Sequence, residues 1–187
     1  EKASGESIRL LVLGGSQGAA AINDVMPGVL QRLGSNGVSI MHQTGKQKLD
    51  QTVKHYQEVG FELSDKVQVT SFIEDMPSAY AWCDLVICRS GASTVSEIAA
   101  AGKPSILIPY PHHRDNQQVF NANWLVDGGA ACMMLQQNLS VDSLSAQIQE
   151  LIGVVGKLKS MAEKARGIAI LNADKMIADE CLELANA

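Results

Sequence analysis

The feature that most constrains the fold is a regular alternation of short apolar runs with amphipathic stretches, which continues to about residue 135. Each apolar run ends at glycine, proline or a polar turn, as is typical of a strand followed by a helix. The predicted strands are residues 8–13, 38–42, 67–70, 85–88, 105–108 and 131–135. The predicted helices between them are residues 19–33, 47–58, 78–82, 93–101 and 117–126. This alternation predicts a Rossmann-like, doubly wound α/β domain, in which helices cover both faces of a parallel sheet of about six strands.

The rest of the chain is predicted to be a C-terminal helical tail. Helical patterns cover residues 141–152, 156–170 and 172–185. We expect one domain over residues 8–187, because no linker, repeat or low-complexity segment interrupts the pattern. Residues 1–7, EKASGES, are neither a methionine start nor a signal peptide. We expect them to be disordered or left over from cloning, and the chain to be a piece of a longer protein.

Composition and charge exclude several function classes. The net charge is -5 and aromatic residues make up 4% of the chain, so the basic surface and stacking aromatics of a nucleic-acid binder are not expected. The four cysteines form no C-x-x-C pair, and no D-x-D pair of carboxylates occurs. No apolar run approaches the roughly 18 residues that span a bilayer. We therefore expect a cytoplasmic protein with reduced thiols, no metal and no cofactor.

The first chemically distinctive turn is Gly14-Gly15-Ser16-Gln17-Gly18-Ala19, directly after the first predicted strand. Glycines in such a turn let backbone N–H groups approach a phosphate at a helix N-terminus. The turn departs from G-x-G-x-x-G because Ser16 occupies the second glycine position, and the second strand ends in His42-Gln43 rather than in an acidic residue. The turn therefore predicts a phosphate site of another type, or a tight turn with no ligand.

A second turn rich in glycine, serine and threonine follows the fourth predicted strand, at residues 89–97. Its backbone amides and the hydroxyls of Ser93 and Thr94 can hold a diphosphate at the start of the next helix. Glu97 lies one turn into that helix and can accept two hydrogen bonds from a vicinal diol such as a ribose. The alternative is a capping box, in which Ser93 or Thr94 caps the helix and Ser96 or Glu97 reaches back.

A third polar loop, residues 110–118, follows the fifth predicted strand. The paired amides of Gln117 and Gln118 suit sugar hydroxyls, which need both a donor and an acceptor. The alternative is a solvated loop in which Asp115 caps the helix. In a doubly wound sheet, all three loops leave the carboxyl ends of strands, where ligands bind near the topological switch point.

These residues resemble a known family, the MurG family of bacterial N-acetylglucosaminyltransferases, which convert lipid I to lipid II in peptidoglycan synthesis. The motifs that carry the resemblance are GGSQGA (14–19), HQTGK (42–46), FIEDM (72–76), CRSGASTVSEIAAAGKP (88–104) and HRDNQQ (113–118). The resemblance covers about residues 8–184. It implies a GT-B arrangement of two Rossmann-like domains, of which this chain is similar to the second, carboxyl-terminal one.

The resemblance also implies roles for individual residues. It implies that the backbone of Ile73 reads uracil, that Met76 lines the base pocket, and that Glu97 takes the ribose hydroxyls. Arg89 is expected near the nucleotide, and Gln117 and Gln118 at the N-acetylglucosamine. The residues expected at the diphosphate are Ser16, Ala92, Ser93, Thr94, Val95 and Ser96. The roles of His112, His113, Arg114 and Asp115 stay open.

The function implied is that of the donor-binding half of an inverting transferase that takes UDP-N-acetylglucosamine. The general base, the lipid I contacts and the main membrane contact are expected in an amino-terminal domain outside this chain, so this chain alone is expected to bind donor without turnover. The whole protein is expected to be peripheral on the cytoplasmic face of the inner membrane and to serve cell shape and division. Two alternatives are a stand-alone UDP-sugar-binding subunit that recruits a membrane partner, and a glycolipid synthase.

Overall fold

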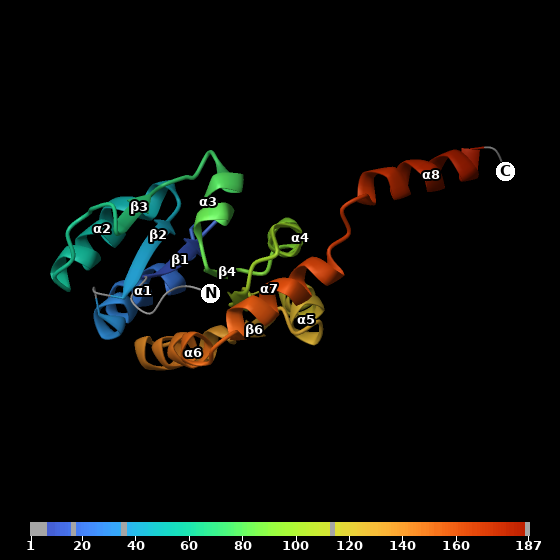
Figure 1. Ribbon diagram of the computed structural model, residues 1–187. Coiled ribbons are helices and arrows are strands. Elements are labelled where there is room, and N and C mark those ends of the chain that lie inside the picture. The colour runs from blue at the N-terminus through green and yellow to red at the C-terminus, as the bar shows by residue number, and fades with distance from the viewer. Residues whose placement is uncertain (1–6, 16–17, 35–36, 113–114, 186–187) are drawn as a thin grey trace.

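Six parallel strands form one sheet in the order β3-β2-β1-β4-β5-β6 (Figure 1). The computed structural model describes residues 7–15, 18–34, 37–112 and 115–185, so Ser16 and most of the expected disordered start lie outside the described residues. The strands are β1 (Ile8–Leu13), β2 (Val38–Gln43), β3 (Val67–Thr70), β4 (Leu85–Cys88), β5 (Ser105–Leu107) and β6 (Ala131–Met133). The prediction of a doubly wound parallel sheet is confirmed.

Helices connect the strands and continue beyond the last of them. Those within the sheet region are α1 (Ala20–Leu33), η1 (Lys46–Lys48), α2 (Leu49–Glu58), α3 (Met76–Trp82), α4 (Ala92–Ala101) and α5 (Gln117–Asp127). After β6 come η2 (Gln136–Asn138), α6 (Val141–Gly153), α7 (Lys157–Ile168) and α8 (Ala173–Ala185). Strands β5 and β6 are shorter than predicted. After β5, which ends at Leu107, apolar burial continues without strand pairing, and Ile108 is fully buried; after β6, which ends at Met133, the chain turns outward and Leu135 is exposed.

The core consists of two apolar layers, one on each face of the sheet. Along β1, Leu10 and Val12 point into a layer with α1, α2 and α6, whereas Leu11 and Leu13 point into a layer with α3, α4 and α5. This two-sided burial is why the strands read as continuous apolar runs rather than as alternating apolar and polar residues.

The last helix, α8, is set apart from the rest. None of its residues is buried, and in Figure 1 it extends away from the sheet and its covering helices. Among the described residues, no helix is long and apolar enough to cross a membrane.

The sheet has its switch point at β1, which pairs with β2 on one side and with β4 on the other. Helix α1 packs on one face of the sheet and α4 on the other. In such a sheet a crevice opens at the carboxyl ends of the two strands where the winding direction reverses. The first turns of α1 and α4 therefore flank the same crevice.

Candidate functional site

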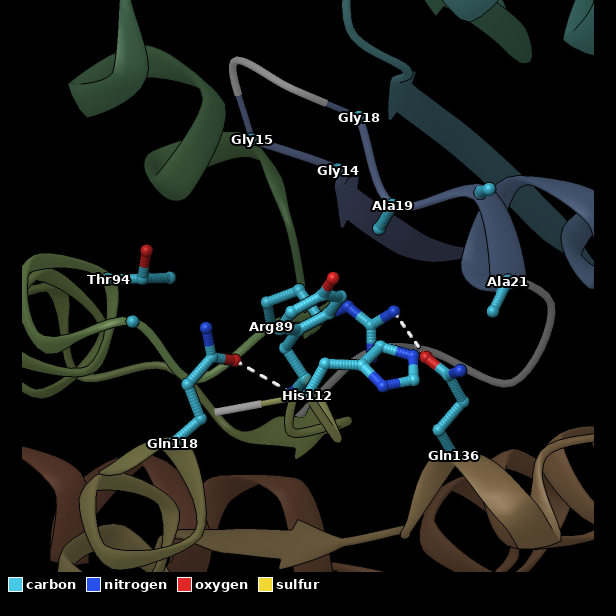
Figure 2. Close-up of a pocket in the computed structure, with 13 residues that line it drawn as sticks. Gly14, Gly15, Gly18, Ala19, Ala21, Arg89, Thr94, His112, Gln118 and Gln136 are labelled. Atoms are coloured by element: carbon cyan, nitrogen blue, oxygen red, sulfur yellow. Dashed lines mark hydrogen bonds between the residues drawn. The ribbon is translucent and has the colours of Figure 1, made fainter. Parts of the chain in front are cut away.

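Two adjoining cavities, of about 710 Å³ and 270 Å³, occupy this crevice. They share Gly14, Gly15, Arg89 and Thr94, so they form one continuous cleft. The larger cavity is also lined by Gly18, Ala19, Ala20, Ala21, Gly91, Tyr110, His112, Gln118 and Gln136. The smaller is also lined by Leu13, Gln43, Phe72, Ile73, Met76, Cys88 and Glu97. In the view of Figure 2 Gly14, Gly15 and Gly18 lie along one side of the larger cavity, Gln118 and Gln136 lie along the other, and Arg89 lies between them.

The glycine turn after β1 is shaped by contacts within the protein. A Cβ on Gly14 would lie 2.9 Å from the backbone oxygen of Gln43, and one on Gly18 would lie 2.4 Å from that of Thr44. The N–H groups of Gly14, Gly15 and Gly18 all donate to protein oxygens. The glycines therefore set the path of the turn, and the donors that the described part of this segment leaves for a ligand lie at the start of α1.

Helices α1 and α4 both begin without a side-chain cap. The residues before them are Ala19 and Gly91, and neither cap position makes a side-chain hydrogen bond. Ala20 and Ala21 line the larger cavity, and the described residues include no acceptor for their N–H groups. Free N–H groups and the positive end of the helix dipole favour an anion at each of these ends.

The capping-box alternative for the second turn is wrong. Gly91, not Ser93 or Thr94, occupies the cap position of α4. The Ser96 hydroxyl donates to the backbone oxygen of Ala92, 3.1 Å away, and Glu97 accepts a hydrogen bond from the Tyr80 hydroxyl on α3. The serine and threonine hydroxyls are therefore not consumed by capping this helix.

Arg89, directly after β4, is held by uncharged oxygens. Its Nη1 donates to the backbone oxygens of Ile108 (3.0 Å) and Pro109 (3.1 Å), and its Nη2 donates to Oε1 of Gln136 (2.5 Å). The guanidinium carbon lies 5.5 Å from the centre of the Tyr110 ring. Burial lowers the pKa of Arg89, but an arginine keeps its charge at neutral pH. Because no described carboxylate forms an ion pair with it, Arg89 brings a positive charge into the cleft.

Glu97 is oriented by a buried tyrosine. The hydroxyl of Tyr80, on α3, donates to Oε2 of Glu97 over 3.0 Å. Burial, and then the charge of Glu97, raise the pKa of Tyr80, so this hydroxyl keeps its proton. The bond fixes one carboxylate oxygen and leaves Oε1 for a ligand at the wall of the smaller cavity, which Ile73 and Met76 also line.

A buried polar network supports the glycine turn from behind. Nδ2 of Asn23 donates to the backbone oxygen of Thr44 (2.9 Å), so its Oδ1 faces Nε2 of His42 (3.1 Å) and accepts a hydrogen bond from the N–H there. The other ring nitrogen, Nδ1, then accepts from the Tyr56 hydroxyl (3.0 Å). Burial lowers the pKa of His42 to about 3, so the ring is neutral. The network fixes the Thr44 carbonyl against which Gly18 packs.

The two glutamines of the third loop differ in placement. Oε1 of Gln118 accepts from the Tyr110 N–H (2.9 Å), and Gln118 lines the larger cavity. Gln117 is exposed and is not among the described residues that line either cavity. Asp115 accepts from the Gln117 N–H at 3.4 Å, whereas the cap position of α5 is Asn116.

The remaining predicted residues divide into three groups. Ala92, Ser93 and Ser96 are exposed on the first turns of α4. The Val95 side chain is buried in the core, and its N–H donates to the backbone oxygen of Gly91, so it offers the cleft no polar group. Ser16, His113 and Arg114 lie outside the described residues.

Comparison with known proteins identifies the chain's family. The family model for the glycosyltransferase family 28 C-terminal domain matches residues 9–181. The chain belongs to this family.

Two curated relatives of this family 28 domain have the same name. This chain is 45% identical over 181 residues to the UDP-N-acetylglucosamine--N-acetylmuramyl-(pentapeptide) pyrophosphoryl-undecaprenol N-acetylglucosamine transferase of Shewanella frigidimarina. The match covers 96% of this chain and 49% of the relative. The chain is 49% identical over 177 residues to the enzyme of the same name from Vibrio campbellii, with 95% and 48% covered. The domain therefore spans about half the length of the curated relatives that it matches.

A solved structure supports the same assignment. The crystal structure of Acinetobacter baumannii MurG superposes on this family 28 domain with a TM-score of 0.85 at 35% identity, and the match covers 95% of this chain and 50% of that one. The fold is therefore one half of a GT-B arrangement, as the sequence predicted.

Sequence reasoning missed four residues that shape the site of this family 28 domain. They are Gln43, Tyr80, Tyr110 and Gln136, none of which was predicted as a site residue. Gln43 lies within a motif, HQTGK, and at a strand end, which is a signal that could have found it. Tyr80 and Gln136 carry no such signal, because their partners Glu97 and Arg89 lie on other segments of the chain.

Proposed function

We propose that this family 28 domain binds UDP-N-acetylglucosamine and is the donor half of an inverting transferase that adds N-acetylglucosamine to lipid I, giving lipid II. One observation carries the proposal: two uncapped helix N-termini face a cleft that also holds the positive charge of Arg89 and the carboxylate of Glu97. This combination suits a diphosphate joined to a ribose. The names of the relatives supply the sugar and the acceptor.

In the proposed complex the nucleoside occupies the smaller cavity. The backbone of Ile73 reads the uracil edge, Met76 packs against the base, and Glu97 accepts hydrogen bonds from the ribose hydroxyls. The diphosphate lies between the starts of α1 and α4, with Ser16 in the turn beside it. Gln118, which lines the larger cavity, and Gln117 at the start of α5 are proposed for the N-acetylglucosamine.

The proposed contribution to catalysis is stabilisation of the leaving group. As the acceptor hydroxyl attacks C1 of the sugar, the bond from C1 to the phosphate oxygen breaks and negative charge grows on UDP. The N–H groups of Ala20 and Ala21, which have no acceptor among the described residues, the start of α4 and the guanidinium of Arg89 are already in place around that charge, so little reorganisation is needed in the transition state. The base that takes the acceptor proton is proposed to belong to the other half of the protein.

Binding and turnover by the isolated chain test this proposal. We expect calorimetry to detect binding of both UDP and UDP-N-acetylglucosamine, with no change on adding EDTA, because helix N-termini rather than a metal face the phosphates. We expect no transfer to lipid I by the 187-residue chain alone. Failure to bind UDP would refute donor binding, and transfer by the chain alone would show that the acceptor chemistry also lies in this half.

Replacing Glu97 tests the ribose contact. Glu97→Ala should weaken UDP binding by about 1.5–3 kcal/mol, the scale for losing hydrogen bonds to a charged group. The variant should also lose discrimination between UDP and 2′-deoxy-UDP, measured by calorimetry. Glu163→Ala, which removes an exposed carboxylate from α7, is the matched control and should bind UDP as the parent chain does. Unchanged UDP affinity together with a lower melting temperature would mean that Glu97 serves only the fold.

A further inference from the structure

We propose that Gln43 is a positioning residue that sets the spacing between the diphosphate-binding turn and the nucleoside-binding loop. This inference rests on the proposed function, because it assigns the two loops to two parts of one nucleotide. Gln43 is the last residue of β2, and it is 5% exposed. A glutamine so deeply buried needs partners for its amide, and those partners define what it does.

The amide of Gln43 joins two separate loops. Its Oε1 accepts from the N–H of Gly15 (2.9 Å), and its Nε2 donates to the backbone oxygen of Gly15 (3.0 Å) and to that of Ser71 (3.1 Å). Gly15 lies in the turn after β1, and Ser71 follows β3 directly. Because β2 lies between β1 and β3, a side chain at its end is placed to connect the turns on both sides.

This connection needs one acceptor and two donors at the end of one side chain, a combination that only a carboxamide of this length supplies. One oxygen accepts, and both hydrogens of the NH2 group donate. A carboxylate in its place keeps the acceptor but cannot donate to either carbonyl. An apolar side chain loses all three bonds.

The connection lies at the point where the two halves of the ligand would meet. Gln43 lines the smaller cavity together with Gly14 and Gly15 of the first turn and with Phe72 and Ile73, which follow Ser71. Because the hydrogen bonds of Gln43 hold the two loops at a fixed spacing, a ligand that contacts both loops does not have to order them, and no binding free energy is lost to that ordering. Without the connection, each loop can still bind its own part of the nucleotide, but the advantage of binding both parts in one molecule falls.

The backbone around Gln43 is anchored independently of its side chain. The N–H of Gly14 donates to the backbone oxygen of Gln43 (2.8 Å), and the N–H of Thr44 donates to that of Thr70 (2.9 Å). Substituting the side chain therefore leaves the pairing of β2 with its neighbours in place, and the variants are expected to fold.

The test compares one ligand with its two fragments. Dissociation constants for UDP, uridine and inorganic pyrophosphate are measured by ligand-observed NMR for the parent chain, Gln43→Met and Gln43→Glu. The coupling is the product of the two fragment constants divided by the UDP constant. We expect Gln43→Met to lower the coupling about tenfold or more while each fragment constant changes by less than about threefold, since the lost term is the ordering of the loops. Gln43→Glu should lower the coupling similarly and weaken pyrophosphate binding as well, because it adds a negative charge.

Gln68→Met is the matched control. Gln68 lies on β3, its Nε2 donates to the backbone oxygen of Asp65 (3.2 Å), and it is exposed. This variant should keep the parent coupling. Unchanged coupling in both Gln43 variants would overturn the inference, as would equal weakening of UDP and both fragments, which is what a purely structural role gives. Should Gln43→Met not fold, Gln43→Glu decides by the same ratio. Failure of the parent chain to bind UDP would instead refute the proposed function.

Discussion

Lowering the pH from 6.5 should destabilise the folded protein by about 1.4 kcal/mol per pH unit through His42 alone. Burial lowers the pKa of His42 from 6.5 to about 3. Between these values the unfolded chain takes up a proton that the folded protein does not, so the free energy of unfolding falls as the pH falls. The stabilisation from the neutral ring is fully present above pH 6.5 and is lost progressively as the pH approaches 3. Urea unfolding measured between pH 7 and pH 4.5 should show this slope.

Two substitutions assign the slope to His42. His42→Gln should lower the stability at pH 7, because it disturbs the hydrogen bonds to Asn23 and Tyr56. Its free energy of unfolding should fall less steeply with falling pH, because the unfolded variant takes up one proton fewer. His55→Gln, which removes a histidine from α2 and leaves His42 in place, should keep the parent slope. Parallel slopes for the parent chain and His42→Gln would mean that His42 is protonated in the folded protein.

Gly18→Ala should destabilise the protein by about 2–5 kcal/mol, the sum of a left-handed backbone strain and an overpacked contact. Gly18 has φ of 72°, and an added Cβ would lie 2.4 Å from the Thr44 oxygen. That oxygen cannot retreat easily, because it accepts from the Asn23 amide (2.9 Å). The overlap should displace the turn, so UDP binding should weaken with stability. Urea unfolding and calorimetry measure the two effects.

Gly15→Ala separates the two causes. Gly15 has the same φ of 72°, but nothing lies within 4 Å of its added Cβ. Its substitution should therefore cost only the backbone strain, about 1–2 kcal/mol. If both variants lost equal stability, contact with Thr44 would not be what requires glycine at position 18.

The strands and the loops of the site could be predicted from the sequence for one physical reason. A parallel sheet buries both faces of its strands, so the strands appear as apolar runs and the polar turns after them must meet at one edge. Residues 8–13, 67–70 and 85–88 were predicted with the bounds that the structure has. Glu97 and Ile73, predicted from separate motifs, line the same cavity.

Contacts between side chains distant in sequence could not be predicted in this way. Glutamine is a residue type that is usually exposed, so the sequence does not reveal that Gln43 is buried. Its amide finds partners only because β2 lies between β1 and β3 in the sheet. Gln136 reaches Arg89 only because β6 pairs with β5. The T-x-x-E pattern from Thr94 to Glu97 allowed a capping box at the start of α4, but Gly91 takes the cap position and Glu97 bonds to Tyr80.

The position of the cleft at the switch point has a consequence for how the protein folds. The two helix starts that flank the cleft follow β1 and β4, and these strands pair with Leu10 opposite Leu85, across all of β2 and β3. Contacts that close so long a loop form slowly, since the chain loses entropy before the sheet gains its bonds. One wall of the cleft follows β1 and the other follows β4. A folding intermediate in which β1 and β4 have not yet paired therefore does not contain the cleft. A nucleotide that binds only the joined sheet would act on the final docking of the two parts, and would slow unfolding rather than speed early collapse.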